Sequence, residues 1–265
     1  MFTVSINAAC IQMEVEHCSK TDNITKALSM AEKAVSSGAD LIVLPEVFST
    51  GFCYEGISDL AEEAPFPTIS KFIGFSKIKE CAVIGSIIEA QFQEGIPVFY
   101  NMCFCVEHGK LAGIYRKCHL FRQEKNYFAA GSSMHPLFLK SYGLNIGLEI
   151  CYELRFPEVA RKLVLEGADL LVTVAQFPNP RKHIWRTLAL ARSIENQIPH
   201  IACNMVGSSP ASSFFGGSII IDAAGDVLVE ADGDECIIMH AIDTENTNKV
   251  RRDIPVYSDR RAELY

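Results

Sequence analysis

Three residues with reactive or charged side chains each follow a segment of the 265-residue chain that is patterned like a strand. They are an acid, a cation and a thiol, namely Glu46, Lys117 and Cys151. Because active sites of open α/β sheets lie where strands end, the three side chains could meet at one sheet edge. Each also has an ordinary interpretation, as a surface loop acid, a solvated lysine and a core cysteine. Position alone therefore leaves their function open.

The stretch around Cys151 carries the most information. Residues 144–150 alternate between apolar and polar side chains, which predicts a strand. Pro157 suits the first turn of a helix, which Gly167 would end. Backbone N–H groups at such a junction can lower the pKa of a thiol and stabilise an oxyanion. A buried core cysteine remains the simpler alternative, since the chain has ten cysteines.

Length and composition bound the class of protein. The chain is long enough for one large domain or two small ones, and 49% hydrophobic with 21% charged residues predicts a globular protein with a sizeable core. A net charge of −8 and a pI of about 5.4 disfavour nucleic acid and anionic membranes as partners. A small anionic substrate would need only one local positive site. We find neither a signal-peptide pattern nor an apolar stretch long enough to span a bilayer.

The cysteines form no compact, regularly spaced framework. We therefore expect free thiols in a reducing compartment and a cytoplasmic location. Cys103 and Cys105 would share one face of a strand, so core packing explains them better than zinc does. No set of His, Cys and Asp residues has the spacing of metal ligands, and we predict neither a metal site nor a cofactor.

Hydrophobic periodicity predicts alternating helices and strands. Helices are expected from a cap at Thr21 or Asp22 to Gly38, at about 67–80, after Pro157, and at about 181–197. Strands are expected at 3–12, 41–44, 81–89, 97–107, 111–116, 136–140, 143–150, 169–174, 200–205, 216–222, 226–231 and 235–242. The segment 118–135 is a long loop, which suggests a functional role. The residues from 245 onwards are expected to form an extended tail.

One short internal similarity suggests two related halves. Gly38–Leu44 resembles Gly167–Thr173, and each follows a predicted amphipathic helix. Two such halves would place helices outside two sheets that pack face to face, giving an α/β fold arranged as a four-layer α-β-β-α sandwich. Chance remains an alternative, because junctions of a helix, a glycine and a strand are common.

Three separated motifs resemble those of the nitrilase, or carbon–nitrogen hydrolase, superfamily. They are Leu-Pro-Glu46-Val-Phe-Ser-Thr-Gly-Phe, Tyr-Arg-Lys117-Cys-His-Leu-Phe and Cys151-Tyr-Glu-Leu-Arg-Phe-Pro-Glu. The resemblance extends over nearly the whole chain. It implies a single carbon–nitrogen hydrolase domain over residues 1–265, with the α-β-β-α sandwich already expected. It also implies a homodimer or higher homo-oligomer, with the tail at 245–265 in the dimer interface.

The resemblance also implies roles for the three residues. Cys151 would be the nucleophile, Glu46 the general base, and Lys117 an oxyanion donor together with the backbone N–H of Tyr152. An acyl-thioester would form, ammonia or an amine would leave, and water would release the acid. Glu124 is assigned a supporting role, with a solvated loop acid as its alternative.

Two residues close in sequence to Lys117 and Cys151 are not expected to be catalytic. Glu153 stands where many relatives have aspartate and is expected to be structural. His119 is expected to pack beside the site rather than to act in a Cys–His pair.

Within the superfamily, the motifs look closest to the ω-amidase branch, which hydrolyses short dicarboxylic monoamides. Arg155 would then clamp the substrate carboxylate, although it could instead pair with Glu158. Phe177 is expected to wall the pocket, and loop 47–57 to cover it. Two alternative activities within the superfamily stay open: hydrolysis of an N-carbamoyl amine, and hydrolysis of another aliphatic amide or a nitrile.

A function of another class also stays open. The chain could be a non-enzymatic or redox-sensing protein on the same scaffold. A redox sensor would need a second thiol near Cys151, and Cys118 is the candidate for it.

Overall fold

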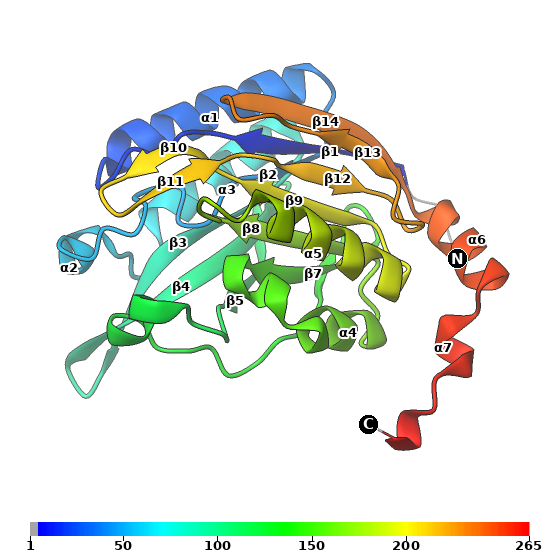
Figure 1. Ribbon diagram of the computed structural model, residues 1–265. Coiled ribbons are helices and arrows are strands. Elements are labelled where there is room, and N and C mark those ends of the chain that lie inside the picture. Colours follow the sequence, from blue (N-terminus) through cyan, green and yellow to red (C-terminus); the bar gives the residue numbers. More distant parts are fainter. Residues whose placement is uncertain (1–4, 265) are drawn as a thin grey trace.

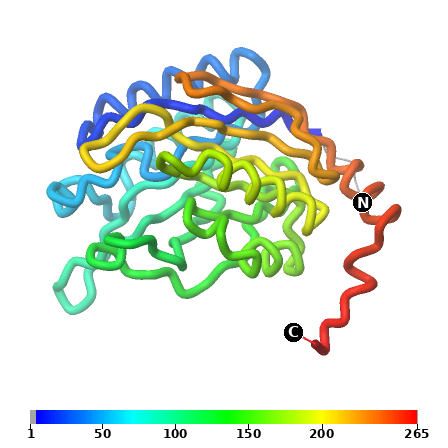
Figure 2. The backbone as a smooth tube through the Cα atoms, viewed as in Figure 1, coloured from blue at the N-terminus to red at the C-terminus, as the bar shows by residue number. Residues whose placement is uncertain are grey.

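The computed structural model describes residues 5–264, and Figures 1 and 2 show the course of its backbone. One sheet contains β1 (Ser5–Gln12), β2 (Leu41–Val43), β3 (Ala82–Gln93), β4 (Ile96–Glu107), β5 (Lys110–Arg116) and β14 (Cys236–Asp243). Its strand order is β14-β1-β2-β3-β4-β5. The other sheet contains β6 (Leu137–Leu139), β7 (Leu144–Ile150), β8 (Leu170–Ala175), β9 (His200–Asn204), β12 (Ile219–Ile221) and β13 (Val227–Glu230). Its order is β13-β12-β9-β8-β7-β6. Each sheet contains three neighbouring parallel strands, β1, β2 and β3 in the first and β7, β8 and β9 in the second.

Helices cover the outer face of each sheet. α1 (Lys20–Ser36) and α3 (Pro67–Lys79) pack on the first sheet through a cluster that includes Ile24, Phe72 and Phe104. α4 (Pro157–Leu165) and α5 (Lys182–Asn196) pack on the second sheet, as Figure 1 shows. The predicted four-layer α-β-β-α sandwich is therefore confirmed.

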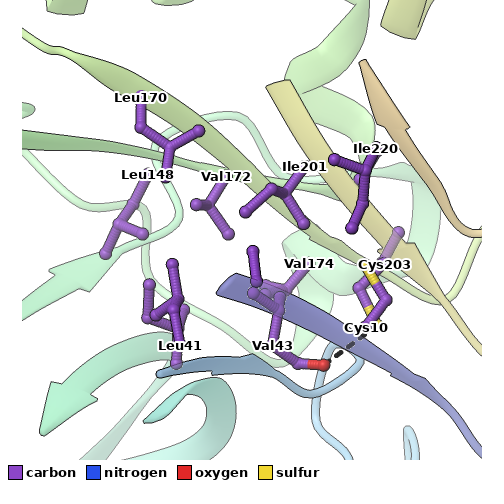
Figure 3. Close-up of a cluster of buried hydrophobic side chains, with 14 of the residues drawn as sticks. Cys10, Leu41, Val43, Leu148, Leu170, Val172, Val174, Ile201, Cys203 and Ile220 are labelled. Carbon is purple, nitrogen blue, oxygen red and sulfur yellow. Dashed lines mark hydrogen bonds between the residues drawn. The ribbon is translucent and has the colours of Figure 1, made fainter. Parts of the chain in front are cut away.

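The main core lies between the two sheets (Figure 3). Cys10, Leu41 and Val43 of the first sheet face Val172 and Ile201 of the second, and all five are fully buried. Successive strand residues point to opposite faces, so their neighbours along the chain pack against the helices instead. This two-sided burial explains why β2 and β8 read as continuous apolar runs.

The two similar segments of the sequence occupy equivalent places. Asp40 precedes β2 and accepts a hydrogen bond from Asn7 N (2.9 Å), while Asp40 N donates to Asn7 O (2.8 Å). Asp169 precedes β8 and has the same pair of bonds with Asn145, both at 2.8 Å. In each half the aspartate fixes the start of a central strand against its neighbour. The short similarity thus reflects a repeated structural unit.

Several elements differ from the sequence prediction. Ser19, not Thr21 or Asp22, is the N-cap of α1, and Cys151–Arg155 form a 3₁₀ helix (η2) before α4. Residues 3 and 4 of the predicted first strand lie outside the described part of the chain. The prediction also missed one hairpin and three short helical elements: β10 (Val206–Ser209), β11 (Ser212–Phe215), α2 (Ile57–Leu60), η1 (Arg122–Asn126) and η3 (Ala262–Leu264).

The C-terminal segment is helical rather than extended. α6 (Thr244–Asp253) begins where Asp243 Oδ1 accepts a bond from Glu245 N (2.8 Å), a side-chain cap that the sequence prediction overlooked. α7 (Val256–Asp259) follows, and Figure 1 shows this part of the chain running away from the sheets.

One pair of cysteines is oxidised. Cys18 and Cys53 form a disulfide, whereas the other eight cysteines are free. The expectation of free thiols throughout is wrong at this pair, because two segments 35 residues apart in sequence meet there. None of the helices in residues 5–264 is both long and apolar enough to cross a membrane.

Candidate active site

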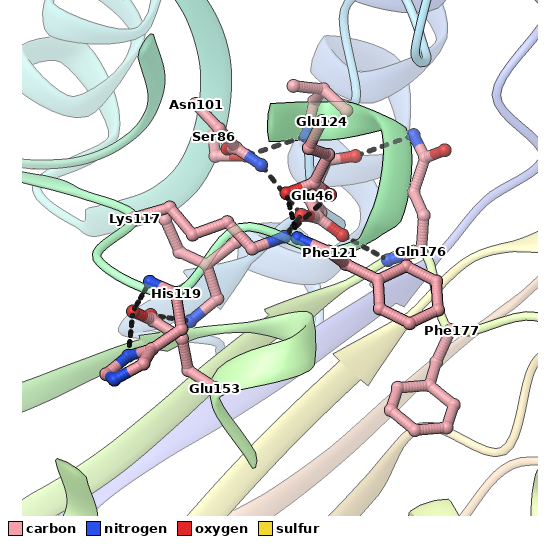
Figure 4. Close-up of polar contacts among 12 residues, drawn as sticks. Glu46, Ser86, Asn101, Lys117, His119, Phe121, Glu124, Glu153, Gln176 and Phe177 are labelled. Atoms are coloured by element: carbon pink, nitrogen blue, oxygen red, sulfur yellow. Dashed lines mark hydrogen bonds and ion pairs between the residues drawn. The ribbon is translucent and has the colours of Figure 1, made fainter. Parts of the chain in front are cut away.

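The carboxylate of Glu46 lies at the centre of a buried polar cluster (Figure 4). Oε1 accepts hydrogen bonds from Lys117 Nζ and Asn101 Nδ2, both at 2.7 Å. Oε2 accepts one from Gln176 N at 2.9 Å, and Gln176 Nε2 donates to the backbone carbonyl of Glu46. Three donors therefore hold a fully buried carboxylate in one orientation.

Lys117 follows β5 and joins two carboxylates. Its Nζ donates to Glu46 Oε1 and, at 2.9 Å, to Glu124 Oε1. Burial by itself lowers the pKa of the Lys117 ammonium, but the negative charges of Glu46 and Glu124 outweigh burial and raise it above the ordinary value. An ammonium has three N–H donors, of which two are used here. One donor remains for a further acceptor.

Glu124 lies in the loop predicted to be functional, on η1. Its Oε2 accepts a bond from Phe121 N (3.0 Å), which leaves Oε1 for Lys117. The loop returns to the sheet where Gly131 N donates to Lys117 O (2.8 Å), and a Cβ at residue 131 would collide with the carbonyl of Arg116. Burial and the nearby Glu46 charge raise the pKa of Glu124. It is a buried partner of Lys117 and not a solvated loop acid.

Cys151 lies at the junction of β7 and η2, with only 8% of its surface exposed. Its backbone φ of +50° is in the left-handed region, which is uncommon for a residue other than glycine. Val47, next to Glu46, has a φ of +36°, which is rarer still for a β-branched residue. Backbone strain thus lies beside both candidate reactive groups.

The thiol of Cys151 is not predisposed to ionise. Burial, followed by the charge of Glu46, raises its pKa well above the ordinary value, although Lys117 opposes this shift. The expectation of a lowered pKa is therefore wrong for this state of the site. The physical reason is that a buried thiolate beside a carboxylate costs more than the junction and the ammonium can offset.

Glu153 ties the segments of Lys117 and Cys151 together. Its Oε1 accepts bonds from Tyr115 Oη (2.6 Å) and Cys118 N (2.8 Å), and its Oε2 accepts one from Ile150 N (2.9 Å). His119 stacks on Phe156 with ring centroids 4.2 Å apart. These contacts agree with the structural position expected for Glu153 and the packing position expected for His119.

A cavity of about 500 Å³ opens over Cys151. Five of the predicted site residues line it, namely Glu124, Cys151, Tyr152, Arg155 and Phe177. Glu46 and Lys117 lie behind this surface and are fully buried. Phe52 and Tyr54 of loop 47–57 also line the cavity, as expected. A volume of this size suits a small molecule.

The cavity wall carries three guanidinium groups, from Arg122, Arg155 and Arg181. The guanidinium carbon of Arg155 lies 5.9 Å from the centroid of the Phe177 ring, and within residues 5–264 it makes no ion pair with Glu158. Arg181 donates to the carbonyl of Asn179 at 3.3 Å. The lining also contains the carboxylates of Glu55 and Glu124, so cationic side chains outnumber acidic ones in the wall of this cavity.

Sequence reasoning missed two partners of Glu46. They are Asn101, whose side-chain amide donates to Oε1, and Gln176, whose backbone N–H donates to Oε2. Gln176 directly follows β8, and Glu46 lies three residues after β2, so a place shortly after a buried strand was a usable signal for Gln176. Arg122 and Arg181 carried no such signal, because neither directly follows a strand: Arg122 begins η1 and Arg181 is the N-cap of α5.

Comparisons with known proteins place this geometry in a family. A sequence profile described as Carbon-nitrogen hydrolase matches residues 7–252, and the chain belongs to that family. It is 36% identical over 262 residues to a 2-oxoglutaramate amidase of Bacillus subtilis (strain 168), covering 97% of this chain and 98% of the relative. It is 31% identical over 278 residues to Omega-amidase NIT2 of Homo sapiens, covering 98% and 97%.

Solved structures agree with this assignment. Saccharomyces cerevisiae Nit3, of the nitrilase superfamily, has a TM-score of 0.89 at 26% identity and 97% coverage of both chains. A carbon-nitrogen hydrolase from Helicobacter pylori G27 has a TM-score of 0.89 at 28% identity, covering 98% of this chain and 97% of its own. The protein is an amidase that hydrolyses carbon–nitrogen bonds other than peptide bonds.

Proposed function

We propose that the chain is an ω-amidase-like enzyme that releases ammonia from the terminal amide of a short dicarboxylic monoamide. The observation that carries this proposal is the cavity that contains Cys151 together with Arg155. A guanidinium can hold a carboxylate through two parallel hydrogen bonds, which would direct the amide at the other end of the substrate to the thiol. Relatives named 2-oxoglutaramate amidase and Omega-amidase add support.

In the proposed mechanism, Glu46 removes the thiol proton as Cys151 Sγ attacks the amide carbon. The neutral resting thiol supports this order, because its raised pKa leaves the proton in place until attack. The free N–H of Lys117 and the backbone N–H of Tyr152 would stabilise the oxyanion. Tyr152 lies in the first turn of η2, where N–H groups lack partners within the helix.

The intermediate then collapses, and Glu46 returns its proton to the leaving nitrogen, so that ammonia departs and an acyl-thioester remains. Glu46 next accepts a proton from water, whose oxygen attacks the thioester carbon. Collapse of the second intermediate breaks the C–S bond, and the thiol regains its proton. Glu124 would support this cycle by holding Lys117 in place and by lining the cavity.

The test is ammonia release from a substrate panel. It contains 2-oxoglutaramate, succinamate, glutamine, an N-carbamoyl amino acid, an aliphatic amide and an aliphatic nitrile. Cys151→Ala should abolish turnover, whereas Cys236→Ser, a free and partly buried cysteine outside the cavity lining, should retain it. A preference for the carbamoyl compound or the nitrile would remove the proposed substrate and keep the mechanism.

Arg155→Lys distinguishes a role of Arg155 in binding the substrate carboxylate from a role in hydrolysis of the amide. Loss of paired hydrogen bonds to a charged group costs about 1.5–3 kcal/mol, so kcat/KM for carboxylate-bearing amides should fall about 10- to 100-fold. Turnover of the aliphatic amide should change little. Arg186→Lys is the matched control, because Arg186 pairs with Glu230 on the outside of α5. Equal losses for both substrate types would show that Arg155 does not bind the carboxylate.

The redox-sensing alternative receives little support. Cys118 lines a different cavity, with His119 and Met134, and its Sγ lies 3.6 Å from the carbonyl of Ser133. The disulfide of the structure joins Cys18 and Cys53 instead.

We further propose that residues 1–265 act as a single catalytic domain and form a homodimer or larger homo-oligomer through the segment 245–265. The side chains of Ile254 and Leu264, 63% and 61% exposed, support an interface there. A cytoplasmic location stays a proposal, supported by the eight free cysteines. In a reducing compartment, Cys18 and Cys53 would be two thiols instead of a disulfide.

A further inference from the structure

Four side chains with metal-binding atoms converge at the rim of the cavity. His17 and Cys18 precede α1, and Cys53 and Glu55 lie in the loop that follows Glu46. Their ligand atoms all lie within 4.8 Å of one another. His17 Nε2 is 2.8 Å from Glu55 Oε1, and Cys18 Sγ is 3.5 Å from the same oxygen.

The two segments are held together independently of the disulfide. Cys18 N donates to Thr50 O at 2.8 Å. Asn23 Nδ2 donates both to Glu16 O (2.7 Å) and to Ser49 O (3.1 Å). Asn23 is itself buried, so these bonds are shielded from water. Cleavage of the Cys18–Cys53 bond therefore need not separate the four side chains.

The donor set matches one class of ligand. Two thiolates, an imidazole and a carboxylate suit zinc, which prefers four tetrahedral nitrogen, sulfur and oxygen ligands. Zinc–sulfur bonds of about 2.3 Å would place the two sulfurs about 3.8 Å apart. The Cα atoms of Cys18 and Cys53 are 5.2 Å apart, so rotation of the side chains can provide this separation. A sulfur–sulfur bond cannot coexist with it.

We propose that the reduced protein binds one Zn²⁺ ion through His17, Cys18, Cys53 and Glu55, and that the Cys18–Cys53 disulfide excludes the ion. Formation of the site begins with a dithiol reductant, which gives two electrons and two protons to the disulfide and becomes a disulfide itself. The two resulting thiols then lose their protons to solvent as Zn²⁺ binds both sulfurs. Neutral His17 and the Glu55 carboxylate complete the four ligands.

The zinc site would hold in place part of the wall of the substrate cavity. His17 and Glu55 line that cavity, and the loop between Glu46 and Glu55 also carries Phe52 and Tyr54. Bound zinc would cross-link this loop to the start of α1 in the reduced protein, as the disulfide does in the oxidised protein. The loop thus has a cross-link available in both redox states.

Cobalt(II) provides a direct spectroscopic test. The full chain carrying Cys151→Ala is used, so that the cavity thiol cannot itself bind metal. After reduction with a phosphine and its removal without oxygen, titration should give one tetrahedral Co²⁺ per chain. The signature is a thiolate-to-cobalt charge-transfer band with visible d–d bands, and both should disappear when Zn²⁺ is added. The oxidised protein should give neither band.

Variants assign the ligands. In the same background, Cys18→Ser and Cys53→Ser should each weaken the thiolate-to-cobalt band, because one of the two thiolate ligands is lost, and His17→Ala should shift the d–d bands, because water replaces a nitrogen ligand. Cys236→Ser is the matched control and should keep both bands. The comparison of reduced and oxidised chains needs none of these variants, so the proposal stays testable if one fails to fold.

Three results would overturn the proposal. The first is a reduced chain that takes up no cobalt. The second is a charge-transfer band that persists when both Cys18 and Cys53 are replaced. The third is loss of the band in Cys236→Ser.

Discussion

At the scale of single residues, the site depends on how charge is distributed around one buried carboxylate. Glu46 accepts from an ammonium, an amide side chain and a backbone N–H, and its own charge raises the pKa of the Cys151 thiol in addition to burial. A base that keeps its nucleophile protonated until attack avoids a buried thiolate in the resting enzyme. This arrangement differs from a preformed thiolate–cation pair.

Glu46→Gln tests this distribution with two readouts. Turnover should fall about 100- to 10,000-fold, because an amide cannot accept the thiol proton. Removal of the negative charge should also lower the pKa of Cys151, so that its alkylation by iodoacetamide begins at lower pH. The measurements are ammonia release and the pH dependence of alkylation. A higher pKa in the variant would contradict the electrostatic account.

At the scale of helices and strands, the position of each reactive residue depends on how the strand that precedes it is packed. Cys151 directly follows β7, and α4 packs so closely on this strand that Gly147 has no room for a side chain. A Cβ at this position would lie 2.9 Å from Leu171 Cδ2 and 3.2 Å from Leu163 Cβ. The glycine therefore sets the distance between the helix and the strand.

Gly147→Ala should lower the free energy of unfolding by about 1–3 kcal/mol, because the extra methyl group overpacks the interface. It should also reduce turnover, since a shift of β7 moves Cys151. Gly74→Ala is the matched control: nothing lies within 4 Å of its Cβ position, and alanine should stabilise α3 by up to about 1 kcal/mol. Urea unfolding measures both effects. Equal stability changes would show that α4 can move away without cost.

At the scale of the whole molecule, one buried acid makes stability depend on pH. Glu149 on β7 is fully buried, one of its oxygens accepts a bond from Thr173 Oγ1, and the other has no partner. Burial raises its pKa from about 4.5 to about 7. The raised pKa means that the folded state favours the neutral acid. The free energy of unfolding contributed by Glu149 is therefore highest below pH 4.5 and is lost as pH rises towards 7.

Glu149→Gln removes this dependence. The difference in the free energy of unfolding between the variant and wild type should grow by about 2–3 kcal/mol in favour of the variant when the pH is raised from 5 to 8. The reason is that the pKa of Glu149 is raised by about 2.5, and each pKa unit corresponds to about 1.4 kcal/mol. Urea midpoints at the two pH values measure the gain. Glu94→Gln, in an exposed turn, should show no such difference. A gain that does not change with pH would point to packing instead of ionisation.

The proposed oligomer is also a property of the whole molecule. Leu264→Asp together with Ile254→Asp should shift the protein towards monomer, since a charge in an apolar interface must be desolvated. Light scattering after size-exclusion chromatography measures the mass. Ile78→Asp is the control, because Ile78 is 77% exposed at the end of α3. An unchanged mass in the tail variant would locate the interface elsewhere.

Patterns along the chain were enough to predict the two halves, the sandwich and the candidate residues Glu46, Lys117 and Cys151. They were enough because strand and helix periods repeat within a few residues, and because a motif is contiguous. The alternation before Cys151 and the apolar runs of β2 and β8 are local signals of this kind.

The groups that surround those residues could be identified only in the folded chain. Gln176 binds Glu46 across 130 positions of sequence, and Cys18 meets Cys53 across 35. The direction in which the pKa of Cys151 shifts likewise depends on burial and on the carboxylate of Glu46, which follows a strand of the other sheet. Such contacts arise when two sheets and their loops pack together, and packing over long separations leaves no periodic trace in the chain. Burial then sets the electrostatics, because it removes the water that would screen each charge.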